Sequence, residues 1–544
     1  MANRITIFTI CAVALLVGPA ATAQADSATQ LPFANGRAAW LAVDPAAGHV
    51  FVSGGAGNSS IVVLNYAGQV VKTITGEGGA SQMTLDSATH TLYVALHDAT
   101  AISEIDTQTL TETRRFSTAP YPAPTSLVIA GGKLWFSCAD GNSGCLVSAN
   151  LDGTGMATPI AGGSFPLFLA AGGTNNHLLA FGYSEDSPPS LYVYDVSGAT
   201  PSQAGYVFDP NGGSSDVADM TFTPGGANLL LATGAPYFIQ SLTTSTLTPS
   251  ADYPTGPYPV AVAVTANGKY VAGGVNTGTG TGNDVFVYPA GSTTPVRAWA
   301  IGSGVPGLLD HSLAFTPDAS RLFAVTNGAA GHLELNVLSQ PTVPLKPSST
   351  SATGSVKTVH YGSRASVKVH LTGPTAGKVD LYATTSAETK QLVATATAAS
   401  GAATFTVTPK ENTTYVAQFE QGSGYATSAS GGVRITVAPV VTVSTRHAGT
   451  GRLHGHRVSK TLFTAKLKPS RPNEPLGFVV QRHVTRRWRT VGTGRFAADT
   501  TGTVHAFFLT NRAGPCRVRV SYSGDADYVK SRSGWKKFRT PSVR

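Results

Sequence analysis

Charged residues are scarce in this 544-residue chain, where Asp, Glu, Lys and Arg together make up only 12%. Cysteine is scarcer still, with four residues, and one of them lies in an apolar N-terminal run. No stretch after that run reaches the length of apolar sequence that crosses a bilayer, so no transmembrane helix is predicted. Apolar residues nevertheless make up 42% of the chain, which excludes disorder caused by the lack of a core.

The local motifs of several enzyme classes are also missing. The chain has no GxSxG nucleophile elbow, no HExxH metal motif, no P-loop and no CxxC pair. Four histidines of the last hundred residues lie near one another in sequence, but beside arginines they are expected to be ordinary surface residues. The sequence therefore predicts no catalytic residue, no metal site and no cofactor, and a binding role is favoured over an enzymatic one.

The N-terminus reads as a secretory signal peptide over residues 1–25. Arg4 supplies a positive charge, Ile5–Val17 is an apolar run, and small residues follow it. We expect cleavage after Ala23 or Ala25. The predicted location is therefore secreted, either extracellular or loosely associated with the cell envelope.

Three cysteines lie beyond this signal. Cys138 and Cys145 flank the turn-rich sequence ADGNSG between two strand-like runs, so they are predicted to face each other and form a disulfide. Closing so short a loop would stabilise the fold by about 2–3 kcal/mol in the chain-entropy model. Cys516 has no partner and is expected to be a buried thiol.

Internal repetition is the strongest signal in the sequence. Gly and Pro account for 60 and 33 residues, and seven segments share an apolar strand, a turn and a second strand. Equivalent positions are separated by 42, 44, 41, 52, 42 and 51 residues, and they are Val43, Leu85, Ile129, Ala170, Phe222, Val264 and Phe315. A period near 42 with four short strands per unit predicts a seven-bladed β-propeller over residues 26–340.

Two details extend this prediction. In the second unit the alternation of apolar residues predicts four strands, at Met83–Asp86, Thr91–Leu96, Ile102–Asp106 and Thr111–Phe116. The seventh unit is incomplete, because Pro341 and Pro344 follow its third strand and oppose a further ladder strand. We expect Gln30–Ala34 to supply the missing outer strand and so to close the ring.

The second unit, TLYVALHDATAISEIDTQTLTETRRFST at residues 91–118, resembles the YVTN family of β-propellers. The shared features are a strand ending in Tyr-Val, a polar loop, a strand ending in Ile-Asp-Thr and an exit strand. The resemblance covers roughly residues 30–340 and implies the propeller fold. Such propellers occur in surface and binding proteins, and related seven-bladed folds occur in lactonases, lyases and quinone-dependent dehydrogenases.

The C-terminal third lacks the 42-residue period. Residues 341–353 are rich in Pro, Ser and Thr and are predicted to be a linker. Residues 354–438 and 439–544 each contain about six strand-like runs, the pattern of an immunoglobulin-like sandwich. Both resemble bacterial Ig-like repeats, in YVAQFEQGSGYATSAS (residues 415–430) and VRVSYSGDADYVKSRS (residues 518–533). The overall expectation is an all-β chain, a propeller followed by two sandwiches.

Charge is distributed unevenly along the chain. From residue 440 onward there are 21 Lys and Arg against 4 acidic residues, a net +17, whereas the whole chain carries +9 and residues 1–439 therefore carry −8. This asymmetry suggests an anionic cell-envelope polymer or acidic glycan as a partner, with nucleic acid a minor option. The alternative is a solvated basic face that has no partner. The candidate contact residues interleave cations with an aromatic ring, and they are Arg486, Arg487, Trp488, Arg489, Lys536 and Lys537.

A propeller usually binds its ligand at one mouth of the central channel, where several blades each contribute a residue. The candidate mouth residues are Asp86, His97, Asp219, Asp310 and His311, although such residues more often pin a turn or cap a loop. The first hypothesis is a non-enzymatic protein that binds an unknown protein or glycan, with the Ig-like domains as spacers. The alternatives are a lactonase- or lyase-like enzyme with its site in the channel, and a structural envelope protein.

Overall fold

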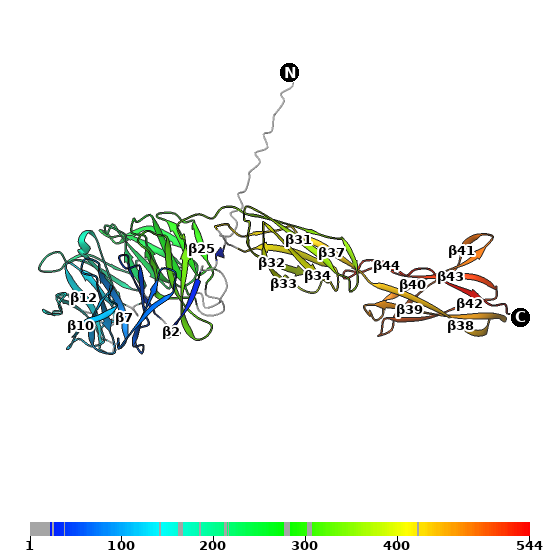
Figure 1. Cartoon of the computed structure of the whole chain (residues 1–544), viewed down its shortest axis with the longest axis horizontal. Coiled ribbons are helices and arrows are strands. Elements are labelled where there is room, and N and C mark those ends of the chain that lie inside the picture. Colours follow the sequence, from blue (N-terminus) through cyan, green and yellow to red (C-terminus); the bar gives the residue numbers. More distant parts are fainter. Residues whose placement is uncertain are drawn as a thin grey trace, which may run out of the picture. The chain divides into compact units, whose positions relative to one another are not determined.

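The computed structural model describes residues 22–23, 27–36, 38–140, 143–160, 167–183, 187–210, 215, 217–276, 283–301, 307–420 and 424–543. The chain divides into two compact units, Met1–Leu345 and Lys346–Arg544, and β-strands dominate both of them (Figure 1). Within the described ranges, no helix has the length and hydropathy that a membrane span requires. The predicted signal segment, residues 1–25, lies outside the described residues except for β1 (Thr22–Ala23), which pairs in parallel with β25 (Arg297–Trp299).

The second repeat shows the plan of the first unit. Its four strands pair antiparallel in chain order, and they are β7 (Ala80–Asp86), β8 (Thr91–Leu96), β9 (Ala101–Asp106) and β10 (Thr111–Ser117). The four strands predicted for this repeat are confirmed, each to within three residues at either end. The alternation of apolar residues around turns therefore located the strands correctly.

The other sheets of the unit follow the same plan. The first contains β3 (Trp40–Asp44), β4 (His49–Ser53), β5 (Ser60–Asn65) and β6 (Val70–Thr75). The third contains β11 (Leu127–Ala130), β12 (Lys133–Asp140) and β13 (Ser143–Ala149). The fourth contains β14 (Leu167–Gly172), β15 (Leu178–Tyr183), β16 (Ser190–Asp195) and β17 (Ser202–Phe208), with a single turn of 3-10 helix, Thr174–Asn176, after β14.

The last three sheets complete the unit. The fifth contains β18 (Val217–Phe222), β19 (Asn228–Thr233), β20 (Phe238–Thr243) and β21 (Thr248–Pro254). The sixth contains β22 (Pro259–Val264), β23 (Tyr270–Val275), β24 (Val285–Pro289) and β25, with β1 at its edge. The seventh contains β26 (Leu308–Phe315), β27 (Arg321–Asn327), β28 (His332–Ser339) and, from the other end of the unit, β2 (Ser27–Ala34).

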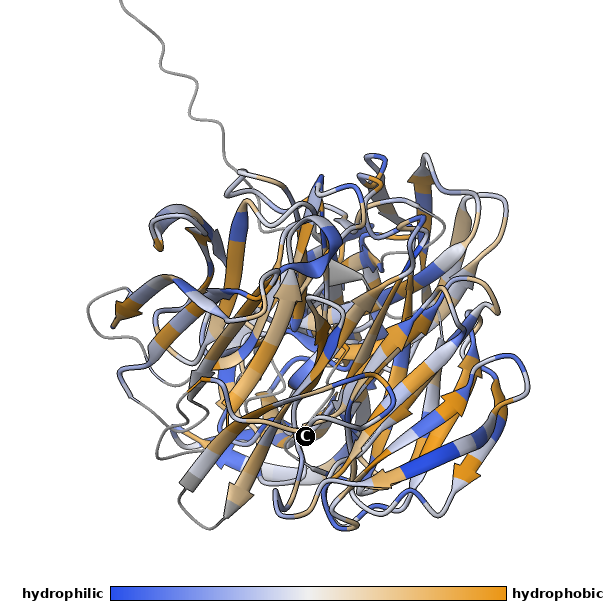
Figure 2. Cartoon of the chain, turned by 90° about the vertical axis from the view of Figure 1, so that its left-hand side faces the viewer, coloured by the Kyte–Doolittle hydropathy of each residue, from blue (hydrophilic) through white to orange (hydrophobic). Residues whose placement is uncertain are grey.

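The sheets follow one another in a cycle. The first strand of each sheet contacts the first strand of the next, and β26 of the last sheet contacts β3 of the first. Strands in the middle of a sheet, such as β4 and β8, are buried almost throughout, whereas the outer strand β10 is exposed. Figure 2 shows this composition as hydrophobic stretches concentrated on the strands. Sheets that bury both faces against their neighbours in a cycle are the arrangement of a β-propeller.

The strand β2 joins the two ends of this cycle. It pairs antiparallel with β28, with Ser27 opposite Val337 and Gln30 opposite Glu334. Leu31 and Phe33 are each only 1% exposed and pack in a core that residues of β27 and β28 share. The prediction that the N-terminal segment supplies the outer strand of the last sheet is therefore confirmed.

The first half of the second unit contains two sheets. One consists of β29 (Ser349–Gly354), β31 (Ala365–Thr372) and β34 (Ala402–Val407). The other consists of β30 (Thr358–His360), β37 (Val433–Ala438), β35 (Thr413–Phe419), β32 (Gly377–Thr384), β33 (Gln391–Ala398) and β36 (Ser428–Ala429). All of β29 except Gly354 lies in the segment 341–353, which the sequence predicted to be a linker. Thr350 and Thr353 fit a strand there, because the β-branched threonine is favoured in strands.

The second half also contains two sheets. One consists of β38 (Val440–Leu453), β39 (His456–Lys468) and β42 (Thr503–Thr510). The other consists of β41 (Arg487–Ala497), β40 (Pro475–Val484), β43 (Gly514–Tyr522), β44 (Ser531–Arg532) and β45 (Lys536–Thr540). Apolar side chains of all four sheets of the unit belong to one continuous core.

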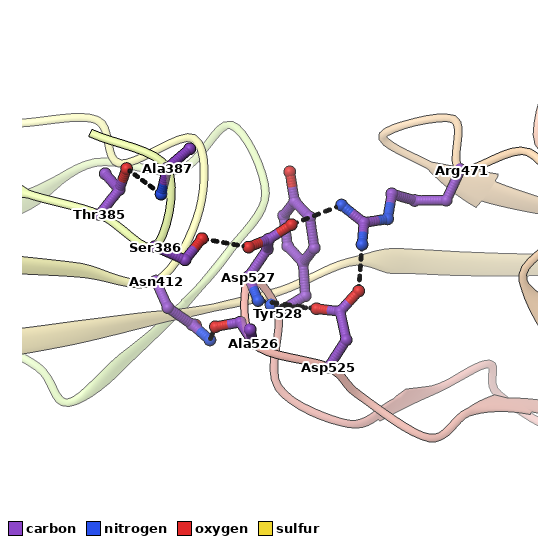
Figure 3. Close-up of polar contacts among 9 residues, drawn as sticks. All are labelled: Thr385, Ser386, Ala387, Asn412, Arg471, Asp525, Ala526, Asp527 and Tyr528. Atoms are coloured by element: carbon purple, nitrogen blue, oxygen red, sulfur yellow. Dashed lines mark hydrogen bonds and ion pairs between the residues drawn. The ribbon is translucent and has the colours of Figure 1, made fainter.

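Polar contacts join the two halves of the second unit (Figure 3). The backbone N–H and the side-chain amide of Asn412 donate to the carbonyl oxygens of Asp527 and Ala526, at 2.7 and 2.9 Å. The carboxylate of Asp527 accepts hydrogen bonds from Ser386 and from Arg471. The hydrogen bond from Ser386, followed by that from Arg471, lowers the pKa of Asp527. The loop 525–528 is therefore the joint between the halves.

Candidate functional site

Two candidate mouth residues of the first unit meet in the structure. His311 lies on β26 and donates from Nδ1 to Oδ1 of Asp219 on β18, at 2.9 Å. The two side chains are only 10% and 12% exposed. Because a carboxylate can only accept, this hydrogen bond fixes the proton of the neutral imidazole on Nδ1.

Two aromatic rings from other sheets enclose this pair. Trp40 of β3 stacks on the His311 ring with a centroid separation of 5.4 Å and an interplanar angle of 14°. Phe168 of β14 meets the same ring edge-on at 4.5 Å. His311 also has a φ of +61°, a backbone conformation that is costly for a residue other than glycine and is often found at functional sites. Side chains of four different sheets therefore converge on one point.

The sequence contained an unused signal for one aromatic member, Trp40. Trp40 and Asp219 occupy the same place in their repeats, directly before the apolar residues Leu41 and Met220. Residues at equivalent places of a cyclic repeat point to the same region of the ring. Comparison of that single position across the repeats would have grouped Trp40 with Asp219.

Asp219 also has a structural role. Its Oδ1 accepts from the N–H of Met220 at 2.9 Å, and its Oδ2 accepts from the N–H of Val262, in the next sheet, at 2.8 Å. Gln82 makes the same kind of bond from its sheet to the next one, to the N–H of Leu127 at 3.0 Å. Asp219 therefore links two sheets while it orients His311.

The remaining mouth candidates make other contacts. Asp86 is the last residue of β7, and its carboxylate accepts from the N–H of Ala88 and the hydroxyl of Thr89, which is the role of a turn former. Asp86 lies at the end of β7, whereas Trp40 and Phe168 lie at the beginning of the equivalent strands β3 and β14. Asp310 precedes His311 on β26, and its carbonyl oxygen accepts from the N–H of Ala39 at 3.2 Å.

His97 follows β8 and supports a loop of the first sheet, residues 54–58 between β4 and β5. Its Nδ1 donates to Oδ1 of Asp98 at 2.8 Å, and the other carboxylate oxygen accepts from the N–H of Gly57, also at 2.8 Å. The hydrogen bond from His97 is the main cause that lowers the pKa of Asp98. His97 thus supports the loop 54–58 through Asp98.

That loop lines a cavity of about 450 Å³. Its described lining is uncharged and rich in small residues, and it consists of Ala34, Asn35, Gly36, Ala38, Trp40, Gly54, Gly55, Ala56, Gly57 and Asn58. The side-chain amides of Asn35 and Asn58 donate to backbone carbonyls of Gly328 and Gly54, so they shape the loops. Trp40 belongs both to this cavity and to the cluster around His311.

The chemistry that the cluster offers is limited. In the part of the chain that the structure describes, no group of three or more His, Cys, Asp and Glu side chains gathers in a way that could hold a metal ion. The Nε2 atom of His311 is buried and has no hydrogen-bond partner among the described residues. A general base must come within hydrogen-bond reach of its substrate, so this geometry favours binding beside the pair over proton transfer by it.

The predicted polyanion contacts occupy two different places in the second unit. Arg486, Arg487 and Arg489 are exposed at the hairpin that connects β40 and β41, whereas Lys536 and Lys537 are exposed at the beginning of β45. Trp488 is half-buried and lies opposite His483.

Arg517 and Arg519 were not among the predicted contacts. Arg517 lies over the rings of Trp488 and Trp535, and Arg519 lies over that of Trp535. The two arginines alternate with the buried residues Cys516 and Val518 on β43, and this alternation was visible in the sequence.

The structure also places the cysteines. Cys138 on β12 lies opposite Cys145 on β13 with a Cα–Cα distance of 5.1 Å, and a disulfide joins them. Cys516 is a free thiol, fully buried on the inner side of β43.

Comparisons with known proteins identify no family. No family model matches the chain, and no curated protein matches it. Among solved structures, it is similar to hydrazine synthase of Kuenenia stuttgartiensis, with a TM-score of 0.44 and 14% identity over 57% of this chain and 97% of that one. It is also similar to the β-propeller domain of Cps50 (Swd1) of Myceliophteria thermophila, with a TM-score of 0.42 and 12% identity over 57% and 99% of the two chains. A functionally unknown protein from Desulfotomaculum acetoxidans gives a TM-score of 0.43 and 14% identity over 56% and 93%. At these scores the similarities carry no argument about activity, ligand or partner.

Proposed function

We propose that this chain is a secreted, non-enzymatic binding protein whose first unit captures a neutral glycan at one mouth of a propeller. In this proposal residues 26–340 form a seven-bladed propeller of the YVTN type. Residues 354–438 and 439–544 form two Ig-like domains that act as spacers and as a contact with the cell envelope. The mature chain is then expected to begin at Gln24 or Asp26.

The support for seven blades is the sheet arrangement. The described residues of the first unit contain seven sheets, and their first strands contact one another in a cycle that returns from β26 to β3. The N-terminal β2 completes the last sheet, as the sequence predicts for a ring that closes on itself. The support for Ig-like domains is the pair of facing sheets in each half of the second unit.

The observation that carries the binding function is the cavity beside Trp40. Its volume of about 450 Å³ is in the range of small-ligand pockets, roughly 300–1,000 Å³. Its described lining has one aromatic residue, no charged side chain and several small residues that leave backbone groups accessible. Such a lining suits an uncharged ligand rich in hydroxyl groups, because accessible backbone groups can donate and accept hydrogen bonds.

One observation favours the second candidate function, a lactonase- or lyase-like enzyme. The bond between Asp219 and His311 has the geometry of an oriented general base. However, the rings of Trp40 and Phe168 contact the imidazole and its Nε2 is buried. Turnover of lactone or polysaccharide substrates that disappears in His311→Gln, with the fold intact, would support the enzyme instead.

The binding proposal is tested with the full-length secreted chain on an array of neutral oligosaccharides. Ala56 is exposed in the cavity lining, so Ala56→Trp should fill the cavity without removing a buried contact. We expect this variant to weaken glycan binding at least tenfold with an unchanged melting temperature. Ala88→Trp is the matched control, because Ala88 is an exposed alanine in the turn after β7. Equal binding by wild type and Ala56→Trp would place the ligand elsewhere.

A further inference from the structure

The outer face of one sheet in the second half of the second unit gathers cations from separate strands. On β43, Arg517 and Arg519 alternate with the buried Cys516, Val518 and Val520, so both arginines point away from the core. The register then assigns their neighbours on the same side of the sheet. Lys537 lies opposite Arg517, and Arg539 lies opposite Pro515. Arg495 lies opposite Gly477, which in turn lies opposite Ser521 of β43, so Arg495 is on the same side of the sheet. We call these five cations the outer basic face, namely Arg495, Arg517, Arg519, Lys537 and Arg539.

Indole rings contact two of these cations. The guanidinium of Arg517 lies 4.5 Å from the ring of Trp488 and 4.2 Å from that of Trp535. Arg519 lies 4.5 Å from the ring of Trp535. Arg517 also donates from Nε and Nη2 to Oε1 of Gln481, at 3.0 and 2.7 Å. The arginines are therefore fixed before any ligand arrives, which lowers the entropic cost of binding.

Three of the four acidic residues of this half have partners away from the outer basic face. Asp525 and Asp527 both bind Arg471 at the joint. Asp499 accepts hydrogen bonds from Thr501 and Thr503 in a turn. Meanwhile Arg517 and Lys537 lie directly opposite each other on neighbouring strands, an arrangement that destabilises a sheet when both residues carry the same charge. A ligand that supplies negative charge would relieve this repulsion.

We propose that the outer basic face binds a linear polymer of repeating phosphate groups that lacks bases. Cations two residues apart on a strand are about 6.8 Å apart, and neighbouring strands are about 4.8 Å apart, so the face presents a grid of positive charge to an extended chain. Arginine dominates the set, and its planar fork matches phosphate oxygens. Proteins that grip single-stranded nucleic acid offer free aromatic rings for stacking, whereas here guanidinium groups cover faces of Trp488 and Trp535.

The test uses the full chain and inorganic polyphosphate of defined length as the probe, with fluorescence anisotropy between 50 and 200 mM salt. The double variant Lys537→Gln and Arg539→Gln changes only exposed side chains and leaves the indole-held arginines in place. We expect it to weaken binding at least tenfold. We also expect it to reduce the slope of log affinity against log salt by about two, one for each lost phosphate contact.

The matched control is Lys466→Gln with Lys468→Gln. These exposed lysines of β39 belong to the other sheet of the same half, so the control makes the same change in net charge. It should bind polyphosphate within threefold of wild type. A control that loses as much affinity as the first variant overturns the proposal, because net charge and not this face would then determine binding.

A second variant separates preorganisation from charge. Trp535→Leu keeps every cation but removes the ring that Arg517 and Arg519 share. We expect a three- to tenfold loss of affinity with an unchanged salt slope. Single-stranded DNA with the same number of phosphates should bind no more tightly than polyphosphate. DNA that binds more than tenfold more tightly, or polyphosphate binding that ignores salt, overturns the proposal.

Discussion

The closing strand β2 allows a direct test of the ring. Phe33 lies on this strand, is 1% exposed, and packs in the core that β2 shares with β27 and β28. Its ring lies so close to Gly54 that a Cβ built there would be 2.9 Å from Cγ of Phe33. Because a glycine carries no side chain that could refill the space, Phe33→Ala should leave a large cavity. The expected loss of unfolding free energy is therefore near the upper end of the range for buried phenylalanine, about 4–5 kcal/mol.

Differential scanning calorimetry of the full chain measures this loss. At about 2 °C for each kcal/mol in a large domain, the transition of the first unit should fall by roughly 8–10 °C. Gln30→Ala is the control on the same strand, because Gln30 is exposed and its backbone pairing with Glu334 stays intact. It should shift the transition by less than about 1 °C. If Phe33→Ala behaves like the control, β2 does not hold the ring closed.

Three further predictions concern other parts of the fold. Replacing Cys138 and Cys145 by serine should lower the unfolding free energy by about 2–3 kcal/mol, and reduction of the wild type should give the same shift in a denaturant titration. The lowered pKa of Asp527 means that its stabilisation is complete above its unfolded pKa and is lost as pH falls through the folded one. Asp527→Asn should therefore be less stable than wild type at pH 7 and should lose less stability in acid, as measured by thermal unfolding at pH 7 and pH 3. In Gly172→Ala the new Cβ would lie 2.4 Å from Cβ of Phe222 in the next sheet, so calorimetry should show a loss of about 1–3 kcal/mol, and an unchanged transition would mean that the two sheets can separate there.

The repeat itself made much of the first unit predictable from sequence. A period near 42 located the strands, and the missing last strand of the seventh repeat pointed to residues 30–34. Both inferences needed only the comparison of repeats along the sequence. The meeting of Trp40 with His311 was harder to predict, because it depends on how far each sheet is rotated about the axis. His311 and Asp219 are 92 residues apart in the chain and are joined only in the closed ring.

The second half of the second unit shows a different limit of prediction from sequence. Counting charges identified it correctly as the cationic part of the chain, but the sequence motif around Trp488 drew attention to a hairpin end. The arginines that stack on the indoles come from β43, and their common face follows from strand pairing. A cluster of charges within one segment is visible in a sequence, whereas a cluster across several strands requires the register.

The pairing of β2 with β28 has a consequence for biosynthesis. The strand that is made first must wait until about 300 further residues have been added before its partner exists. During that time Leu31 and Phe33 have no core to enter, and a finished β28 without β2 presents an unpaired edge. Two chains completed side by side could form the same hydrogen bonds by exchanging their first strands. The strand β2 is therefore the element of this protein that is most prone to domain swapping.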